Sequence, residues 1–173
     1  MIIGITGGTG CGKTTLLNEI RKLGGLVLDC DAIYHELLRT DKEMLSAIEN
    51  RFPGVVKDSI LDRKALGSIV FADSNALLDL NAITHAAVKR EVLRQLEEKP
   101  TLAAIDAIGL FEGGLAELCD VTVAVTAPTE LRIQRLCSGM ASPRNTPAAG
   151  SVPSMTKAGS GSAATMFWKT AEP

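Results

Sequence analysis

The chain has 173 residues, of which 46% are hydrophobic, with a formal net charge of -2 and a pI of about 5.7. This length and apolar content suit a single domain with one core, and the slightly acidic balance argues against a nucleic-acid partner held by its phosphates. No apolar run approaches a membrane span and the N-terminus lacks the features of a signal peptide, so we expect a cytoplasmic protein with no membrane partner. The oligomeric state does not follow from composition.

The first predicted strand, Ile2–Thr6, leads directly into Gly-Gly-Thr-Gly-Cys-Gly-Lys-Thr at residues 7–14. This segment is a complete G-x-x-x-x-G-K-[ST] motif, and a helix is predicted behind it over residues 15–23. A strand, a glycine-rich turn and a helix in this order direct backbone N–H groups and the positive end of the helix dipole toward one point, where a polyphosphate binds. A glycine turn that only joins a strand to a helix is the alternative, and the Lys-Thr pair argues against it.

Within the motif, Lys13 is expected to reach the β- and γ-phosphates, and the Thr14 hydroxyl to hold a Mg²⁺ ion between them. Cys11 lies near a helix N-terminus and a lysine, which favour a thiolate, but it also fits as a small loop residue. The four cysteines of the chain show no pairing or metal-ligand spacing, so we expect reduced thiols. The residues expected around the phosphates are Gly7, Gly10, Cys11, Gly12, Lys13, Thr14 and Thr15.

Three more short apolar runs, at residues 25–28, 102–105 and 121–125, are predicted as strands. They are too short for helices and too apolar for half-exposed strands, as expected when helices cover both faces of a parallel sheet. The predicted fold class is therefore α/β, a doubly wound parallel sheet of the P-loop NTPase type.

Residues 32–98, between the second and third strands, are predicted as a helical insertion rather than as part of a sheet. In a phosphate-loop kinase such an insertion holds the phosphoryl acceptor, although a helical pack that only covers the sheet edge has the same periodicity. The helices are predicted at residues 32–38, 42–51, 63–70 and 74–98.

Four carboxylates lie near predicted strand ends. Asp29 and Asp31 follow the second strand, and their spacing of two points the side chains in opposite directions. One is expected to cap the next helix and the other to accept a proton from an attacking hydroxyl group. Asp106 closes the third strand at the position of a Walker B carboxylate, which supports Mg²⁺ through water. Glu112 either faces the same cleft or balances a helix N-terminus.

Basic residues of the later chain allow two interpretations each. His85 and Arg63 belong to the helical insertion, where a lone histidine or arginine is usually packed or solvated. Arg132 and Arg135 are spaced by three at the start of the helix behind the fourth strand, which places both guanidinium groups on one helix face. That helix face either contacts a bound nucleotide or is exposed to solvent.

The composition changes at Ser138. Beyond it Ser, Thr, Ala, Gly and Pro dominate, Leu and Ile are absent, and charges become sparse. Such a segment cannot build a core, so we predict a kinase domain over residues 1–136 and a low-complexity, disordered tail over residues 137–173.

Together these blocks resemble the dephospho-CoA kinase family. The resemblance implies transfer of the γ-phosphate of ATP, with Mg²⁺, to the ribose 3′-hydroxyl of dephospho-coenzyme A, the last step of coenzyme A synthesis. It also implies that Asp31 is the catalytic base and that Arg63 and His85 bind the acceptor. Ala86 departs from a proline that the family often has there. The blocks that carry the resemblance are residues 3–8, 29–31, 61–63 with 69–71, 80–85 and 126–128.

The family continues into an arginine-rich lid and a last strand and helix, which the tail lacks. Back-translation of Met166-Phe167-Trp168-Lys169, read from the third base of the methionine codon, gives Val-Leu-Glu whatever codons are chosen. In the same register residues 139–147 allow a lid-like string. We therefore hypothesise that the chain from about Cys137 is read out of frame, which would impair the activity. Another small-molecule or nucleoside kinase, or a non-catalytic nucleotide-binding remnant, is the alternative function.

Overall fold

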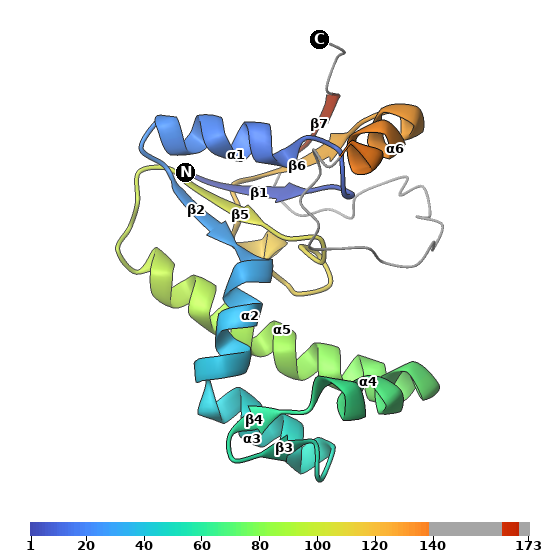
Figure 1. Ribbon diagram of the computed structural model, residues 1–173. Helices are drawn as coiled ribbons and strands as arrows, with labels where there is room; N and C mark the ends of the chain where they lie inside the picture. Colours follow the sequence, from blue (N-terminus) through green and yellow to red (C-terminus); the bar gives the residue numbers. More distant parts are fainter. Residues whose placement is uncertain (139–163, 170–173) are drawn as a thin grey trace. The chain divides into compact units, whose positions relative to one another are not determined.

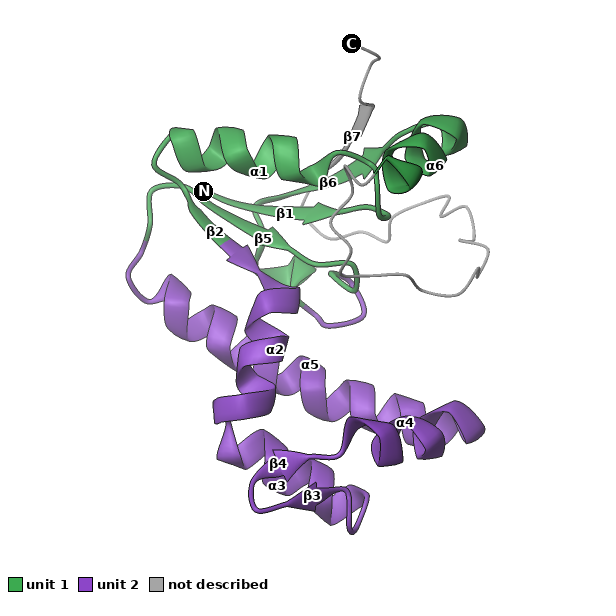
Figure 2. Cartoon of the chain, in the orientation of Figure 1, with its two compact units in different colours: residues 1–27, 100–110, 115–173 green, residues 28–99, 111–114 purple. Residues whose placement is uncertain are grey.

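The computed structural model describes residues 1–138 and 164–169 (Figure 1). These residues form two compact units, which are coloured separately in Figure 2. Unit 1 comprises residues 1–27, 100–110 and 115–173, and unit 2 comprises residues 28–99 and 111–114. Most of the predicted insertion therefore lies in unit 2. None of the described helices is long and apolar enough to cross a membrane.

The larger sheet has the strand order β2-β5-β1-β6-β7 among the described residues. β1 is parallel to both β5 and β6, with Ile5 opposite Asp106 on one side and Val123 on the other. The α/β class and the parallel sheet are as predicted, and each predicted strand is present to within one residue at either end. The strands are β1 (Ile2–Thr6), β2 (Leu26–Asp29), β5 (Ala103–Asp106), β6 (Val121–Thr126) and β7 (Ala164–Lys169).

The strand β7 lies inside the segment predicted to be disordered. It pairs in parallel with β6, from Val121 opposite Ala164 to Thr126 opposite Lys169. The prediction asked only whether the segment could form a hydrophobic core. A strand at a sheet edge instead needs a neighbouring strand with backbone groups available for hydrogen bonding, and residues such as Thr, Phe and Trp that favour strands. Residues 139–163 and 170–173, including most of the predicted tail and the lid-like string, lie outside the described residues.

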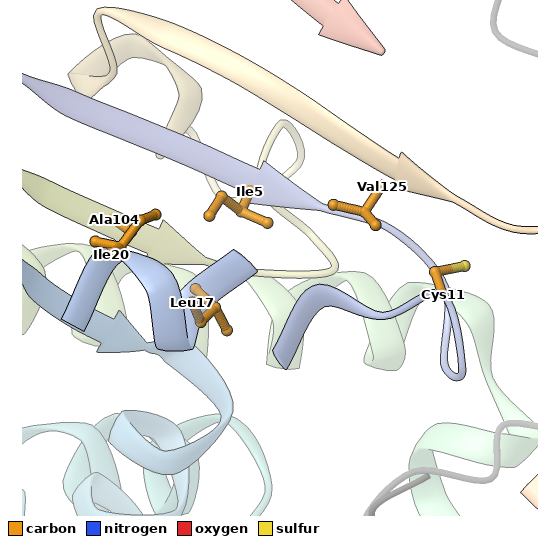
Figure 3. Close-up of a cluster of buried hydrophobic side chains, with 6 residues drawn as sticks. All are labelled: Ile5, Cys11, Leu17, Ile20, Ala104 and Val125. Carbon is orange, nitrogen blue, oxygen red and sulfur yellow. The ribbon is translucent and has the colours of Figure 1, made fainter. Parts of the chain in front are cut away.

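The core of unit 1 lies between helix α1 (Lys13–Lys22) and the sheet (Figure 3). Leu17 and Ile20 of α1 pack with Ile5 of β1 and Val125 of β6, and all four side chains are at most 6% exposed. Helix α6 (Thr129–Cys137) follows β6, and a short 3₁₀ helix, η1 (Ala116–Leu118), precedes it. Because α1 is packed against the sheet through Leu17 and Ile20, the loop that leads into it has a defined position.

Unit 2 is mainly helical. The long helix α5 (Ser74–Leu96) contacts each of the other three helices, and its buried face includes Val88 and Val92. An aspartate caps each of the four helices by accepting hydrogen bonds from N–H groups of the first turn, which explains where they begin. The other helices are α2 (Cys30–Thr40), α3 (Lys42–Arg51) and α4 (Arg63–Ala72).

A hairpin in unit 2 lies between the predicted helices 42–51 and 63–70, in a part of the insertion that was predicted to contain no sheet. Strands β3 (Val56–Lys57) and β4 (Ile60–Leu61) pair in antiparallel fashion. Asp58 and Ser59 connect them with φ values of 51° and 63°, which matches a two-residue turn with positive φ at both positions. The Glu49 carboxylate accepts hydrogen bonds from the N–H groups of Gly54 (2.6 Å) and Val56 (2.7 Å), which fixes the hairpin to α3 and holds the pKa of Glu49 below its usual value.

Candidate nucleotide-binding site

The phosphate-loop motif forms the connection between β1 and α1 in unit 1 (Figure 1). Gly7, Gly10 and Gly12 have φ values of 145°, 81° and 93°, which side chains with a Cβ atom rarely adopt. Gly12 is the N-cap of α1 and supplies no side chain to it, and the first turn of α1 contains no acidic residue. The positive end of α1 is therefore left for an anion from outside the helix.

The lysine of the motif folds back onto its own loop. Lys13 Nζ donates to the carbonyl oxygen of Gly7 at 2.7 Å and lies 3.5 Å from that of Gly8. Its ammonium group thus lies beside the loop, in contact with the loop's own carbonyl groups. Thr14 and Thr15 occupy the first turn of α1 and are exposed.

Asp106 lies at the end of β5, next to the strand that leads into the loop. It is paired with Ile5, and the following N–H, that of Ala107, donates to the Ile5 carbonyl at 3.1 Å. One of its carboxylate oxygens, Oδ1, is buried. Asp106 belongs to the same unit as Thr14, and its role as a Walker B carboxylate stays a prediction.

Two arginines of α6 contact the phosphate loop from outside the motif. Arg132 Nε donates to the carbonyl oxygen of Thr9 at 3.1 Å, and Arg135 Nη1 donates to that of Gly10 at 3.1 Å. Both side chains are half-buried. The interpretation of this face as a solvated one is wrong, because both guanidinium groups lie on the loop.

Cys11 is a core residue of unit 1 rather than an exposed thiol. It is 4% exposed and packs with Ile5, Leu17 and Val125 (Figure 3). Its burial agrees with a small residue that anchors the loop on the sheet. No group of three or more His, Cys, Asp or Glu residues that could hold a metal occurs in the described part of the chain.

The two aspartates behind β2 have separate roles. Asp29 is the N-cap of α2 and accepts from the Ala32 N–H at 3.0 Å. Asp31 lies in the first turn of α2 with its side chain exposed. The prediction that one of the pair caps the helix is therefore confirmed for Asp29, and Asp31 is left as the candidate base.

Tyr34, which the sequence analysis did not single out, lies about one turn after Asp31 in α2. It interacts electrostatically with two of the predicted residues, Asp31 and Arg63. Burial raises the pKa of its hydroxyl above the usual value, the positive charge of Arg63 opposes this shift, and the negative charge of Asp31 adds to it. Asp31 and Arg63 therefore both lie close enough to Tyr34 to interact with it. The only signal in the sequence was a tyrosine three positions after a candidate base on a helix.

His85 and Glu112 also belong to unit 2. His85 is half-buried in α5, and Arg63 begins α4, which packs against α5. Glu112 is exposed in the short segment at residues 111–114, where a Cβ atom on Gly114 would lie 3.1 Å from Lys89 Nζ. The loop residues and Asp106 are thus found in unit 1, and Asp31, Arg63 and His85 in unit 2.

Comparison with known proteins identifies similar chains. The model of the dephospho-CoA kinase family matches residues 1–146. The dephospho-CoA kinase of Paramagnetospirillum magneticum is 39% identical over 139 residues, which is 78% of this chain and 66% of that relative. The dephospho-CoA kinase of Rhodospirillum rubrum is 40% identical over 141 residues, with 79% and 67% covered. The chain spans about two thirds of the length of these relatives.

Two solved structures resemble this one. A crystal structure of a Thermus thermophilus protein is 36% identical with a TM-score of 0.65, and covers 80% of this chain and 71% of its own. Dephospho-CoA kinase from Campylobacter jejuni is 26% identical with a TM-score of 0.55, and covers 79% and 71%. The resemblance therefore holds in sequence and in fold alike.

Proposed function

The chain belongs to the dephospho-CoA kinase family, and from that premise we propose that it transfers the γ-phosphate of ATP to the ribose 3′-hydroxyl of dephospho-coenzyme A. The observation that carries this proposal is the phosphate loop, whose lysine and helix N-terminus face one region of unit 1. Phosphoryl transfer depends mainly on positioning and on charge stabilisation, and these are what such a loop provides.

In this proposal the loop holds the β- and γ-phosphates of ATP. The N–H groups at the start of α1 bind phosphate oxygens, and Lys13 exchanges its contacts with the Gly7 carbonyl for contacts with the phosphates. Each such exchange replaces a hydrogen bond to a neutral carbonyl by one to an anion, which is stronger.

Mg²⁺ fits the same site. The Thr14 hydroxyl and the Asp106 carboxylate are hard oxygen donors in one unit, and Mg²⁺ is usually held by one or two protein oxygens together with phosphates and water. We infer that Thr14 contacts the ion directly and that Asp106 supports it through water. When bound, the ion neutralises charge on the β- and γ-phosphates.

Asp31 is proposed to accept the proton of the ribose 3′-hydroxyl as the hydroxyl oxygen bonds to the γ-phosphorus. The bond between that phosphorus and the bridging oxygen then breaks, and ADP leaves. Arg63 and His85 are proposed to bind the acceptor. Arg63 would do so through phosphate groups of the acceptor, because a guanidinium group matches the geometry of phosphate oxygens. The electrostatic contact of Tyr34 with both Asp31 and Arg63 supports a common site for base and acceptor.

The proposal is tested by measuring ADP and coenzyme A formation from ATP and dephospho-CoA. Lys13→Ala is expected to lower kcat/KM by about a hundredfold or more, because a cation aimed at the transferring phosphoryl group is lost. Lys22→Ala is the matched control, since Lys22 lies on the same helix, its side chain is 71% exposed and it forms a surface ion pair with Glu19. Turnover with nucleosides or other small alcohols but not with dephospho-CoA would instead favour a different kinase.

We also propose that the chain beyond about Cys137 is read out of frame, so that the activity is lower than that of an in-frame protein. The abrupt composition change at Ser138 and the register shared by residues 139–147 and 166–169 support this. The coding DNA is the direct test: codons for residues 140–147 that give no lid-like string in the shifted frame contradict it. With the frame restored, activity should rise by orders of magnitude, and equal activity of both proteins would refute the impairment.

A further inference from the structure

Four consecutive carbonyl groups of the phosphate loop face a cationic side chain. Those of Gly7 and Gly8 lie 2.7 and 3.5 Å from Lys13 Nζ, that of Thr9 accepts from Arg132, and that of Gly10 accepts from Arg135. Lys13 belongs to the motif, but the two arginines come from α6, more than a hundred positions later. The loop is thus held by its own lysine and by a helix outside the motif.

The hydrogen bond from Arg132 fixes the orientation of a peptide group. In a trans peptide the C=O and the N–H point in opposite directions, so the Thr9 carbonyl and the Gly10 N–H lie on opposite sides of the loop. While Arg132 holds the carbonyl on the α6 side, the Gly10 N–H points away from α6. Glycine on one side of this peptide offers little resistance to its rotation, so the restraint comes from the arginine.

Gly8 makes room for the arginine. A Cβ atom at Gly8 would lie 2.6 Å from Arg132 Nη2, and its three nearest atoms would all belong to that guanidinium group. Gly8 does not have a positive φ, so its backbone would accept an alanine. The absence of a side chain at Gly8 is therefore matched to Arg132 rather than to backbone strain.

We propose that Arg132, supported by Arg135, is a positioning residue that orients the phosphate loop for the nucleotide. It acts on the backbone of the loop, through the Thr9 carbonyl, and it sets the affinity for the phosphates of ATP. This inference rests on the proposed function only in taking ATP as the ligand of the loop.

The test measures ATP binding to the full chain by calorimetry. Arg132→Gln is expected to raise the Kd of ATP roughly tenfold, as loss of a charge-assisted hydrogen bond does, while thermal unfolding stays cooperative. Arg132→Lys, which keeps a cationic donor, should recover part of the affinity. Gln134→Ala, an exposed side chain on the same helix, is the control and should bind ATP like the unaltered chain.

A double-mutant cycle separates positioning from simple charge attraction. Gly8→Ala keeps the charge of Arg132 but displaces its guanidinium, so it should weaken ATP binding severalfold in the unaltered chain and have little effect in the Arg132→Gln background. The same fold loss in both backgrounds, or wild-type affinity in Arg132→Gln, overturns the proposal. A chain that binds ATP in this pattern without phosphorylating dephospho-CoA would overturn the proposed function and leave this inference standing.

Discussion

Replacement of Gly7 by alanine tests the geometry at the start of the phosphate loop. The new Cβ atom would lie 2.3 Å from the carbonyl oxygen of Val125 and 3.2 Å from its carbonyl carbon, and both are backbone atoms of β6. Since φ at Gly7 is 145°, an alanine would also be held in a glycine-only region, which costs about 1–3 kcal/mol. Forcing β1 and β6 apart adds about 1–3 kcal/mol more. Gly7→Ala should therefore lower the free energy of unfolding by about 2–6 kcal/mol.

The assay is urea unfolding followed by circular dichroism, with Gly24→Ala as the matched control in the same unit. Gly24 has a positive φ of 78°, but a Cβ atom there would meet nothing within 4 Å. Its replacement carries the backbone strain without the clash and should cost about 1–2 kcal/mol. If Gly7→Ala costs no more than Gly24→Ala, the close approach of loop and β6 does not limit the residue at position 7.

Three further changes probe unit 2. Asp31→Asn should lower kcat by about 10²- to 10⁴-fold with the Kd of ATP unchanged, because the proposed base is lost. Asp29→Asn keeps the helix cap and should have near wild-type activity. Equal losses of kcat for the two variants in steady-state assays would contradict the assignment of Asp31 as the base. The depressed pKa of Glu49 means that its carboxylate stabilises the fold above about pH 4.5 and that this contribution disappears as the pH falls through the lower folded-state pKa. Glu49→Gln should thus be less stable than wild type in urea at about pH 7, and the difference should shrink as the pH falls below about 4.5. Asp41→Ala removes the α3 cap and one of the ion-pair partners of Arg90, and it should cost about 1–2 kcal/mol in thermal unfolding. Asp41→Asn should cost less because the cap remains.

Much of the fold followed from local pattern. The strands of unit 1 were predicted because a parallel strand buried on both faces is a short apolar run, as in β5, where residues 103–105 are all buried. Helices α3 and α4 begin at the predicted residues, because an aspartate marks each start and the capping hydrogen bonds are made within three residues. The hairpin at residues 56–61 was missed, because two-residue strands carry no periodicity and Asp58-Ser59 lacks the glycine that usually marks such a turn.

The residues of the candidate site likewise fall into those that the sequence predicted and those that it did not. The phosphate loop was predictable because its residues are contiguous, and Asp106 because it closes a predicted strand. Tyr34 was not, since its relation to Asp31 and Arg63 depends on how α2 and α4 fold within unit 2. The assignment of Arg63 and His85 to the acceptor came from the family resemblance, and it stays a prediction.

The contacts of α6 show why an intact phosphate-loop motif is not sufficient for a formed site. The hydrogen bonds of Arg132 and Arg135 to the loop span 123 and 125 positions of sequence. They depend on the pairing of β6 with β1, because α6 follows β6 directly and that pairing places it beside the loop. Cys11 adds a second dependence, since its burial against Val125 also requires β6. The conformation of the loop therefore depends on contacts with β6 and α6 as well as on the motif itself. A motif search detects only the part of the site that lies in one continuous segment of sequence.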